Sequence, residues 1–156
     1  MNMKTGLVAL VLPAVLSLSA ADFALVEKGK PAAKIVFEQE PEKLVTDLVD
    51  RFNGHIRTIT GTVLPTEAGA EAANTIKISL REPQKLEQAW TWSVTFPEEH
   101  VMRIEAGKYS LFSALMAVLE KASDCRFLGI ETCMFQYEEK DTLSLPAEPL
   151  RPAPGF

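Results

Sequence analysis

Two histidines are the residues best suited to acid–base chemistry, because an unperturbed histidine titrates near neutrality. His55 stands beside Arg57 in a helical pattern, and His100 follows Glu98 and Glu99 at a turn. A catalytic histidine needs an orienting acceptor and a nucleophile or substrate within hydrogen-bonding reach. Neither stretch indicates such a set, so we expect neither histidine to be catalytic. HExxH, GxSxG, phosphate-loop and metal-spaced His/Cys motifs are absent, so we predict no metal and no cofactor.

Acidic side chains raise the question of sugar chemistry. Hydrolysis of a glycosidic bond needs two carboxyl groups facing each other across the sugar, about 5 to 10 Å apart. The acidic residues here occur at helix starts, turns and exposed faces, where they are common in any protein. The candidates are Glu38, Glu40, Glu42, Asp47, Asp50, Glu98, Glu99, Glu105, Glu138 and Glu139. A solvated surface explains them, and we predict no catalytic residue in this chain.

The aromatic residues of the segment AWTWSVTF admit two interpretations. Trp90, Trp92, Val94 and Phe96 alternate with Thr and Ser, which predicts one apolar face of a strand over 89–96. Such a face normally points into the core. The other interpretation is a sugar-stacking platform at Trp90 and Trp92, because the C–H face of a pyranose packs well on a flat aromatic ring.

Cys125 and Cys133 are the only cysteines of the chain. A disulfide between them is chemically permitted if the protein is exported. The alternative is a pair of buried thiols on neighbouring strands, which behave as small hydrophobic side chains. Strand geometry often holds such pairs unsuitably for bonding, so both interpretations stay open.

The first 21 residues have the pattern of a secretory signal peptide. A short basic start, MNMK, precedes an apolar run and the small residues Ser19-Ala20-Ala21, so we expect cleavage before Asp22 and export. A retained membrane anchor is the alternative for this segment. No later stretch is long and apolar enough to span a membrane. The net charge of −5 argues against a nucleic-acid partner.

The remaining chain predicts one α+β domain over 22–146, followed by a proline-rich linker or tail over 147–156. Apolar residues at helical spacing predict one helix from Pro41 to a stop at Gly61, and a second over 109–122. Gly54 marks a position where the first helix could kink. Alternation predicts strands over 75–80 and 101–106, the latter paired with 89–96 as a hairpin. Further strands are predicted over 23–27, 33–38, 125–128, 132–137 and 142–145, the first two forming a hairpin around Gly29-Lys30-Pro31. We expect a mixed β-sheet with two helices packed on one face.

The order of these segments resembles a known family. The strand GKPAAKIVF, the helix exit ITGTVLP and the strand NTIKISL are followed by FPEEHVMRIEAG, SLFSALMAVLEKASDCRFLG and TLSLPAEPL. This series is similar to the N-terminal, non-catalytic domain of bacterial α-glucuronidases, and to the domain that precedes the barrel in β-N-acetylhexosaminidases. The resemblance covers about residues 24 to 150. Phe127 stands where the family usually has Trp.

The resemblance implies an accessory domain rather than an enzyme. In the family, the catalytic carboxylates belong to a (β/α)8 barrel that follows this domain, so no catalytic residue carries over to this chain. The implied partner is such a barrel, in cis or in trans, and the implied context is breakdown of xylan or other glucuronosides. The alternative is a free-standing exported module that binds a glycan or a protein.

Overall fold

The computed structural model describes residues 21–124 and 138–153 of the chain. The elements are β1 (Asp22–Glu27), β2 (Lys30–Pro31), β3 (Ala33–Phe37), α1 (Lys43–Thr60), β4 (Asn74–Leu80), the 3-10 helix η1 (Leu86–Trp90), β5 (Trp92–Glu98), β6 (Val101–Ala106), α2 (Leu111–Ser123) and β7 (Leu143–Pro146). Most of the predicted signal peptide, the two cysteines and the strands predicted over 125–128 and 132–137 lie outside the described residues. Within them, no helix is long and apolar enough to cross a membrane.

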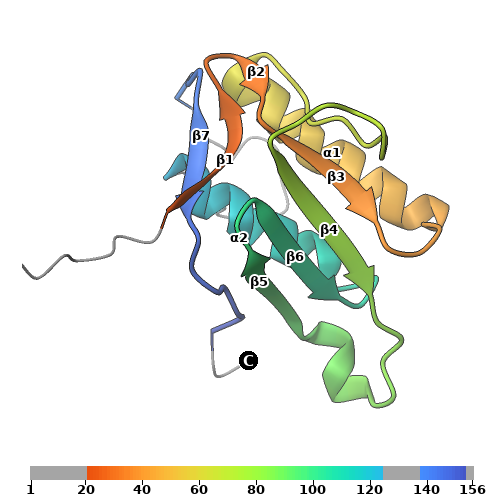
Figure 1. The fold of residues 1–156 in the computed structure, drawn as a ribbon. Helices are drawn as coiled ribbons and strands as arrows, with labels where there is room; N and C mark the ends of the chain where they lie inside the picture. The colour runs from red at the N-terminus through yellow and green to blue at the C-terminus, as the bar shows by residue number, and fades with distance from the viewer. Residues whose placement is uncertain (1–20, 125–137, 154–156) are drawn as a thin grey trace, which may run out of the picture.

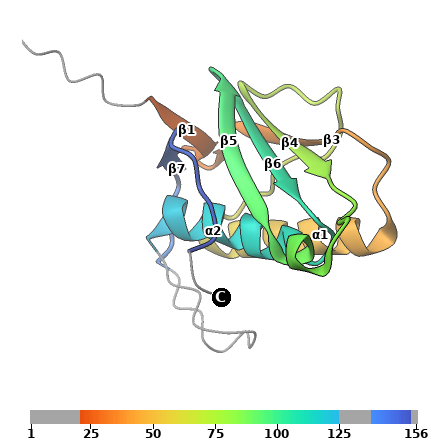
Figure 2. The same ribbon diagram turned by 90° about the horizontal axis from the view of Figure 1, so that it is seen from below.

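The strands form two sheets rather than one. The larger sheet has the order β3-β4-β6-β5, in which β3, β4 and β6 run parallel and β5 is antiparallel to β6. The smaller sheet has the order β2-β1-β7 and is antiparallel throughout. Both helices lie on the same face of the larger sheet (Figures 1 and 2). The predicted α+β class, with a mixed sheet and two helices on one face, is confirmed.

The hairpin predicted from the first two β-rich runs is wrong in its second strand. A turn does form at Lys28 and Gly29, whose φ angles are 51° and 74°, but it joins β1 to the short strand β2. β3 instead pairs in parallel with β4 in the other sheet. Ala33 and Ile35 on β3 are fully buried, and their place in the larger sheet gives them apolar cover.

Helix α1 has the predicted stop and follows the predicted apolar stripe except at Leu44, which is exposed. Val45, Val49, Phe52, Ile56 and Ile59 are buried along one side of the helix. Gly61 ends it in a left-handed conformation with φ of 77°, and its N–H donates to the carbonyl of Arg57. The helix runs without interruption through Gly54, so this glycine does not break it.

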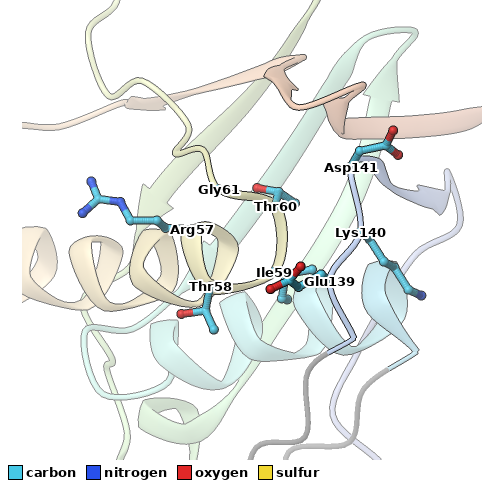
Figure 3. Close-up of a pocket in the computed structure, with 8 residues that line it drawn as sticks. All are labelled: Arg57, Thr58, Ile59, Thr60, Gly61, Glu139, Lys140 and Asp141. Carbon is cyan, nitrogen blue, oxygen red and sulfur yellow. The ribbon is translucent and has the colours of Figure 1, made fainter.

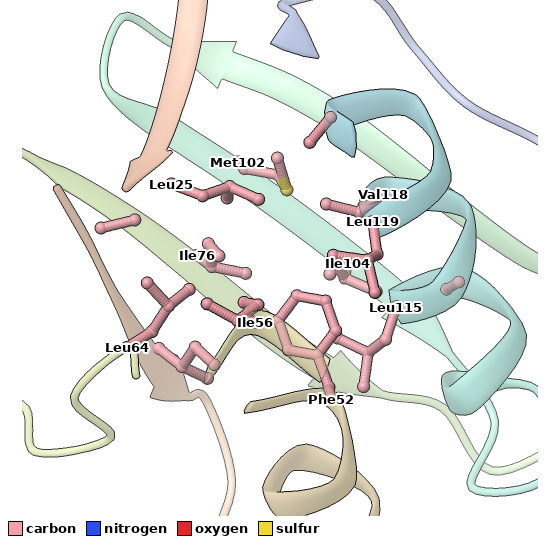
Figure 4. Packing of buried hydrophobic residues seen from close by; sticks show 14 of the residues in the cluster. Leu25, Phe52, Ile56, Leu64, Ile76, Met102, Ile104, Leu115, Val118 and Leu119 are labelled. Atoms are coloured by element: carbon pink, nitrogen blue, oxygen red, sulfur yellow. The ribbon is translucent and has the colours of Figure 1, made fainter. Parts of the chain in front are cut away.

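The core fills the space between the larger sheet and the two helices (Figure 4). Phe52 of α1 is fully buried, together with Ile76 and Ile104 from the sheet and Leu115 from α2. These side chains come from segments far apart in the sequence, and their removal from water is the main favourable term in folding. The core therefore joins both helices and the larger sheet into one unit.

A buried polar residue of α1 fixes the segment that follows the helix. The Asn53 side chain donates from Nδ2 to the carbonyl of Leu64 at 2.9 Å, and its Oδ1 accepts the N–H of Leu64 at 2.9 Å. Asn53 and Leu64 are both buried. The amide thus satisfies two backbone groups that water cannot reach.

Replacing Asn53 by Ala should leave the buried N–H and C=O of Leu64 without these partners. We expect a loss of about 2 kcal/mol in the free energy of unfolding, measured by urea denaturation. Thr58→Ala, at an exposed position of the same helix, is the matched control and should change stability little. Equal stability of the two variants would show that the Asn53 amide does not hold the helix exit.

The two helix glycines should respond in opposite directions to Ala. A Cβ at Gly54 meets no atom within 4 Å, and the position is helical, so Gly54→Ala should stabilise by about 1 kcal/mol. A Cβ at Gly61 also meets no atom within 4 Å, but the backbone there has a positive φ that alanine disfavours. Gly61→Ala should therefore lower the free energy of unfolding by about 1 kcal/mol. Thermal unfolding monitored by circular dichroism measures both effects, and a gain in stability at Gly61 would contradict this assignment.

Candidate functional site

Two aromatic side chains meet on the surface at one end of the larger sheet. Trp90, the last residue of η1, is 65% exposed, and Tyr109, just before α2, is 60% exposed. Their ring centroids are 6.4 Å apart and the ring planes are inclined by 38°. Leu86, at the start of η1, is 82% exposed. We call Trp90, Tyr109 and Leu86 the aromatic patch.

The structure separates the two tryptophans that the sequence placed on one strand face. The strand begins only at Trp92, because Leu86–Trp90 forms a turn of 3-10 helix that ends with the N–H of Thr91 donating to Gln88. Side chains repeat every three residues in a 3-10 helix but every two residues in a strand, so Trp90 does not share the face of Trp92. Trp90 points to solvent, whereas Trp92 is half-buried against the core. The prediction that both face the core is wrong for Trp90. Stacking on sugar stays a prediction.

Buried contacts link the two segments that carry the aromatic patch, which are η1 and the loop before α2. Ser110, which is 2% exposed, donates from Oγ to the carbonyl of Thr91 at 2.9 Å and accepts the N–H of Gly107 at 3.1 Å. A Cβ at Gly107 would stand 3.3 Å from the carbonyl oxygen of Ala89, so the close approach favours glycine. The positions of Trp90 and Tyr109 are therefore set by buried neighbours on both segments.

A polar hollow is lined in part by Gln88 and Thr91, from the segment that carries Trp90. It has a volume of about 590 Å³ and is lined by Arg81, Glu82, Pro83, Gln84, Gln88 and Thr91. Two hydrogen bonds order its rim: the N–H of Arg81 donates to the carbonyl of Ala106, and the N–H of Gln84 donates to the side-chain oxygen of Gln88 at 3.1 Å. The hollow thus offers charged groups and side-chain amides, which donate and accept hydrogen bonds, beside exposed rings.

A second hollow, of about 440 Å³, lies where α1 ends (Figure 3). Its charged side chains do not converge: Arg57 projects along α1, away from Lys140 and Asp141. Lys140 has a structural role here. Its backbone N–H donates to the carbonyl of Ile59 near the end of α1, and its Nζ donates to the carbonyl of Ser123 at the end of α2, each at 2.9 Å. This region joins the two helix ends.

Three of the candidate acids and histidines have neighbours that affect their pKa or hold their side chain in place. A hydrogen bond from Ser79, with the Arg103 guanidinium 3.1 Å away, holds the pKa of Glu38 below its usual range, which favours the carboxylate over a general acid. Burial, with the nearby Arg51, lowers the pKa of His55. His100 bonds through Nδ1 to Oδ1 of Asn74 at 2.8 Å.

Metal ligands are likewise not grouped within the described ranges 21–124 and 138–153. No set of three or more His, Cys, Asp or Glu side chains there could hold a metal ion. Glu38 and Glu105 both lie near the guanidinium of Arg103, at 3.1 and 3.8 Å, and Asp47 pairs with Lys43 at 2.7 Å. These acids therefore have basic partners on the surface, as the sequence predicts for solvated carboxylates.

The comparisons with known proteins identify the fold but no family. No protein-family profile matches the chain, and no protein with a curated description matches it. Among solved structures, the GH20 β-N-acetylhexosaminidase from Streptomyces coelicolor A3(2) is similar, with a TM-score of 0.56, 12% identity, and coverage of 85% of this chain and 23% of that chain. The Streptomyces plicatus N-acetyl-β-hexosaminidase has a TM-score of 0.55, 11% identity and the same two coverages.

The chitobiase of Flavobacterium johnsoniae gives a similar result. Its TM-score is 0.51 and its identity 12%, and the match covers 85% of this chain and 19% of that chain. The chain therefore shares its fold with a minor part of these glycoside hydrolases. None of the three is an α-glucuronidase, so they do not connect the chain to that family.

Replacing Lys140 by Met should weaken the junction of the helix ends, because the Ser123 carbonyl loses a charged donor at the negative end of the α2 dipole. We expect a loss of about 1 kcal/mol in the free energy of unfolding. Lys121→Met, in the last turn of the same helix but exposed, is the control and should lose less. Equal losses in chemical denaturation would show that general charge, and not this contact, stabilises the helix end.

Proposed function

We propose that this chain is a non-catalytic accessory domain of a glycoside hydrolase, which packs against a catalytic (β/α)8 barrel in cis or in trans. The observation that carries the proposal is the fold shared with part of GH20 hexosaminidase chains, matched over 85% of this chain but at most 23% of those chains. Fold alone does not define function, so the site must agree with it.

The described residues agree with a non-catalytic role. Acid–base hydrolysis requires one carboxyl group kept protonated in an apolar setting and a second one facing it. Instead, Glu38 has a lowered pKa and an arginine partner, and Asp47 is paired with Lys43. The lowered pKa keeps the Glu38 carboxyl group charged at neutral pH, and a bare carboxylate cannot protonate a leaving group.

The location and the sugar class are further parts of the proposal. Export is supported by the signal-peptide pattern of residues 1–21. For the sugar, the sequence resemblance favours xylan or other glucuronosides, whereas the names of the structural neighbours favour N-acetylhexosaminides. We retain polysaccharide breakdown as the common context.

The decisive experiment recovers the polypeptide from its native organism with an antibody against the chain. Mass spectrometry of the recovered material should find barrel peptides of a glycoside hydrolase, either in the same polypeptide or in a separate one present in equal amount. The purified chain, residues 22–156, should not hydrolyse an aryl N-acetylglucosaminide or an aryl glucuronide.

Two results would overturn the proposal. Turnover of either substrate by the purified chain would make it an enzyme in its own right. Recovery of the chain without any barrel polypeptide would favour the alternative function, a free-standing module that binds a glycan or a protein.

A further inference from the structure

Exposed large apolar side chains are concentrated at one end of the larger sheet. Among the described residues these side chains are Leu44, Leu86, Trp90 and Tyr109, and all but Leu44 belong to the aromatic patch. Isolated exposed apolar residues are normal on any protein, but a group of them with an aromatic pair commonly marks a binding surface. The patch lies where β4 and β6 end and β5 begins, apart from the helix-end hollow.

The aromatic patch is held in place before any ligand arrives. Ala89 and Ser110, the neighbours of Trp90 and Tyr109 in the sequence, are buried, and the Ser110 hydroxyl bonds to Thr91 across the two segments. A ring carried on such a backbone loses little conformational freedom when a ligand packs on it. Preorganisation of this kind raises affinity by lowering the entropic cost of binding.

The surroundings of the patch fit an uncharged, hydroxyl-rich ligand. The polar hollow beside it is lined by Arg81, Glu82, Gln84 and Gln88, so groups that donate and accept hydrogen bonds stand next to the rings. Positive Arg81 and negative Glu82 adjoin each other, which leaves no strong field of one sign. Nucleic acid and anionic lipid both require such a field, so neither fits this surface.

We propose that the aromatic patch and the polar hollow form a binding site for a neutral pyranose unit of an oligosaccharide. Trp90 stacks on the C–H face of the sugar, and side chains of the hollow bond its hydroxyl groups. Lys108 lies with Nζ 5.5 Å from the centre of the Tyr109 ring and covers part of it, so Tyr109 supports Trp90 rather than replacing it. The inference goes beyond the proposed function, because a domain that only packs on a barrel needs no sugar contact.

The size of the patch favours a sugar over a protein partner. A stable protein interface buries about 800 Å² on each side, with some 20 to 30 residues. The aromatic patch has three apolar side chains and then gives way to the polar hollow. A single pyranose ring, with one apolar face and a polar edge, matches that combination.

Calorimetric titration of the full chain with chitotetraose and with xylotetraose tests the proposal. We expect saturable binding of at least one of the two, and the one bound more tightly identifies the sugar class. Trp90→Ala should weaken that binding by about tenfold, the loss of one aromatic contact. Trp92→Phe, at the half-buried tryptophan, is the matched control and should bind as the parent chain does. Circular dichroism and thermal unfolding verify that both variants remain folded.

Failure to bind either oligosaccharide would overturn the proposal, as would unchanged binding by folded Trp90→Ala. Loss of association with a barrel in Trp90→Ala, without any sugar binding, would assign the patch to a protein contact and would equally overturn it. The titration contains no barrel, so its result is independent of whether the accessory-domain proposal holds.

Discussion

The segment that leads from the end of α1 to the larger sheet is held by hydrogen bonds on both of its sides. The packing of the helix on the sheet depends on this segment. On the helix side, the Asn53 amide exchanges two hydrogen bonds with the Leu64 backbone. On the sheet side, the N–H of Ile35 on β3 donates to the carbonyl of Pro65 at 2.8 Å. Since β3 is an edge strand of the larger sheet, this segment also covers part of an edge that would otherwise present unpaired groups.

A second buried amide connects the two sheets. The Asn74 side chain donates to the carbonyl of Ala24 on β1 at 2.8 Å, and its Oδ1 bonds to His100 in the turn between β5 and β6. One side chain at the start of β4 thereby links β1 to the β5–β6 hairpin. His100 therefore makes a structural contact at the junction of the two sheets.

The aromatic patch and the polar hollow lie on the segments that connect the strands at one end of the larger sheet. In open sheets with parallel strands, ligands commonly bind beyond the carboxyl ends of those strands. Arg81 follows β4 and Gly107 follows β6 at that end, and η1 leads into β5 beside them. Rigid strands fix the ends of these loops, so the exposed rings stand on a firm base while their outer faces stay accessible.

The sequence by itself determined the elements and their buried faces, because hydrophobic periodicity and turn residues act locally. The stripe of α1, its stop at Gly61, the alternation of Ile76 and Ile78, and the two-helix α+β class all followed from it. Only the tertiary structure decided which strands pair. A period of two indicates a strand and its faces but not its neighbour, so the division into two sheets and the parallel partner of β3 were missed. The same holds for the candidate site. Its residue type made Trp90 a candidate, but only the structure shows that one turn of 3-10 helix separates it from Trp92. Tyr109 joined it only through contacts between segments far apart in sequence, which no local pattern records.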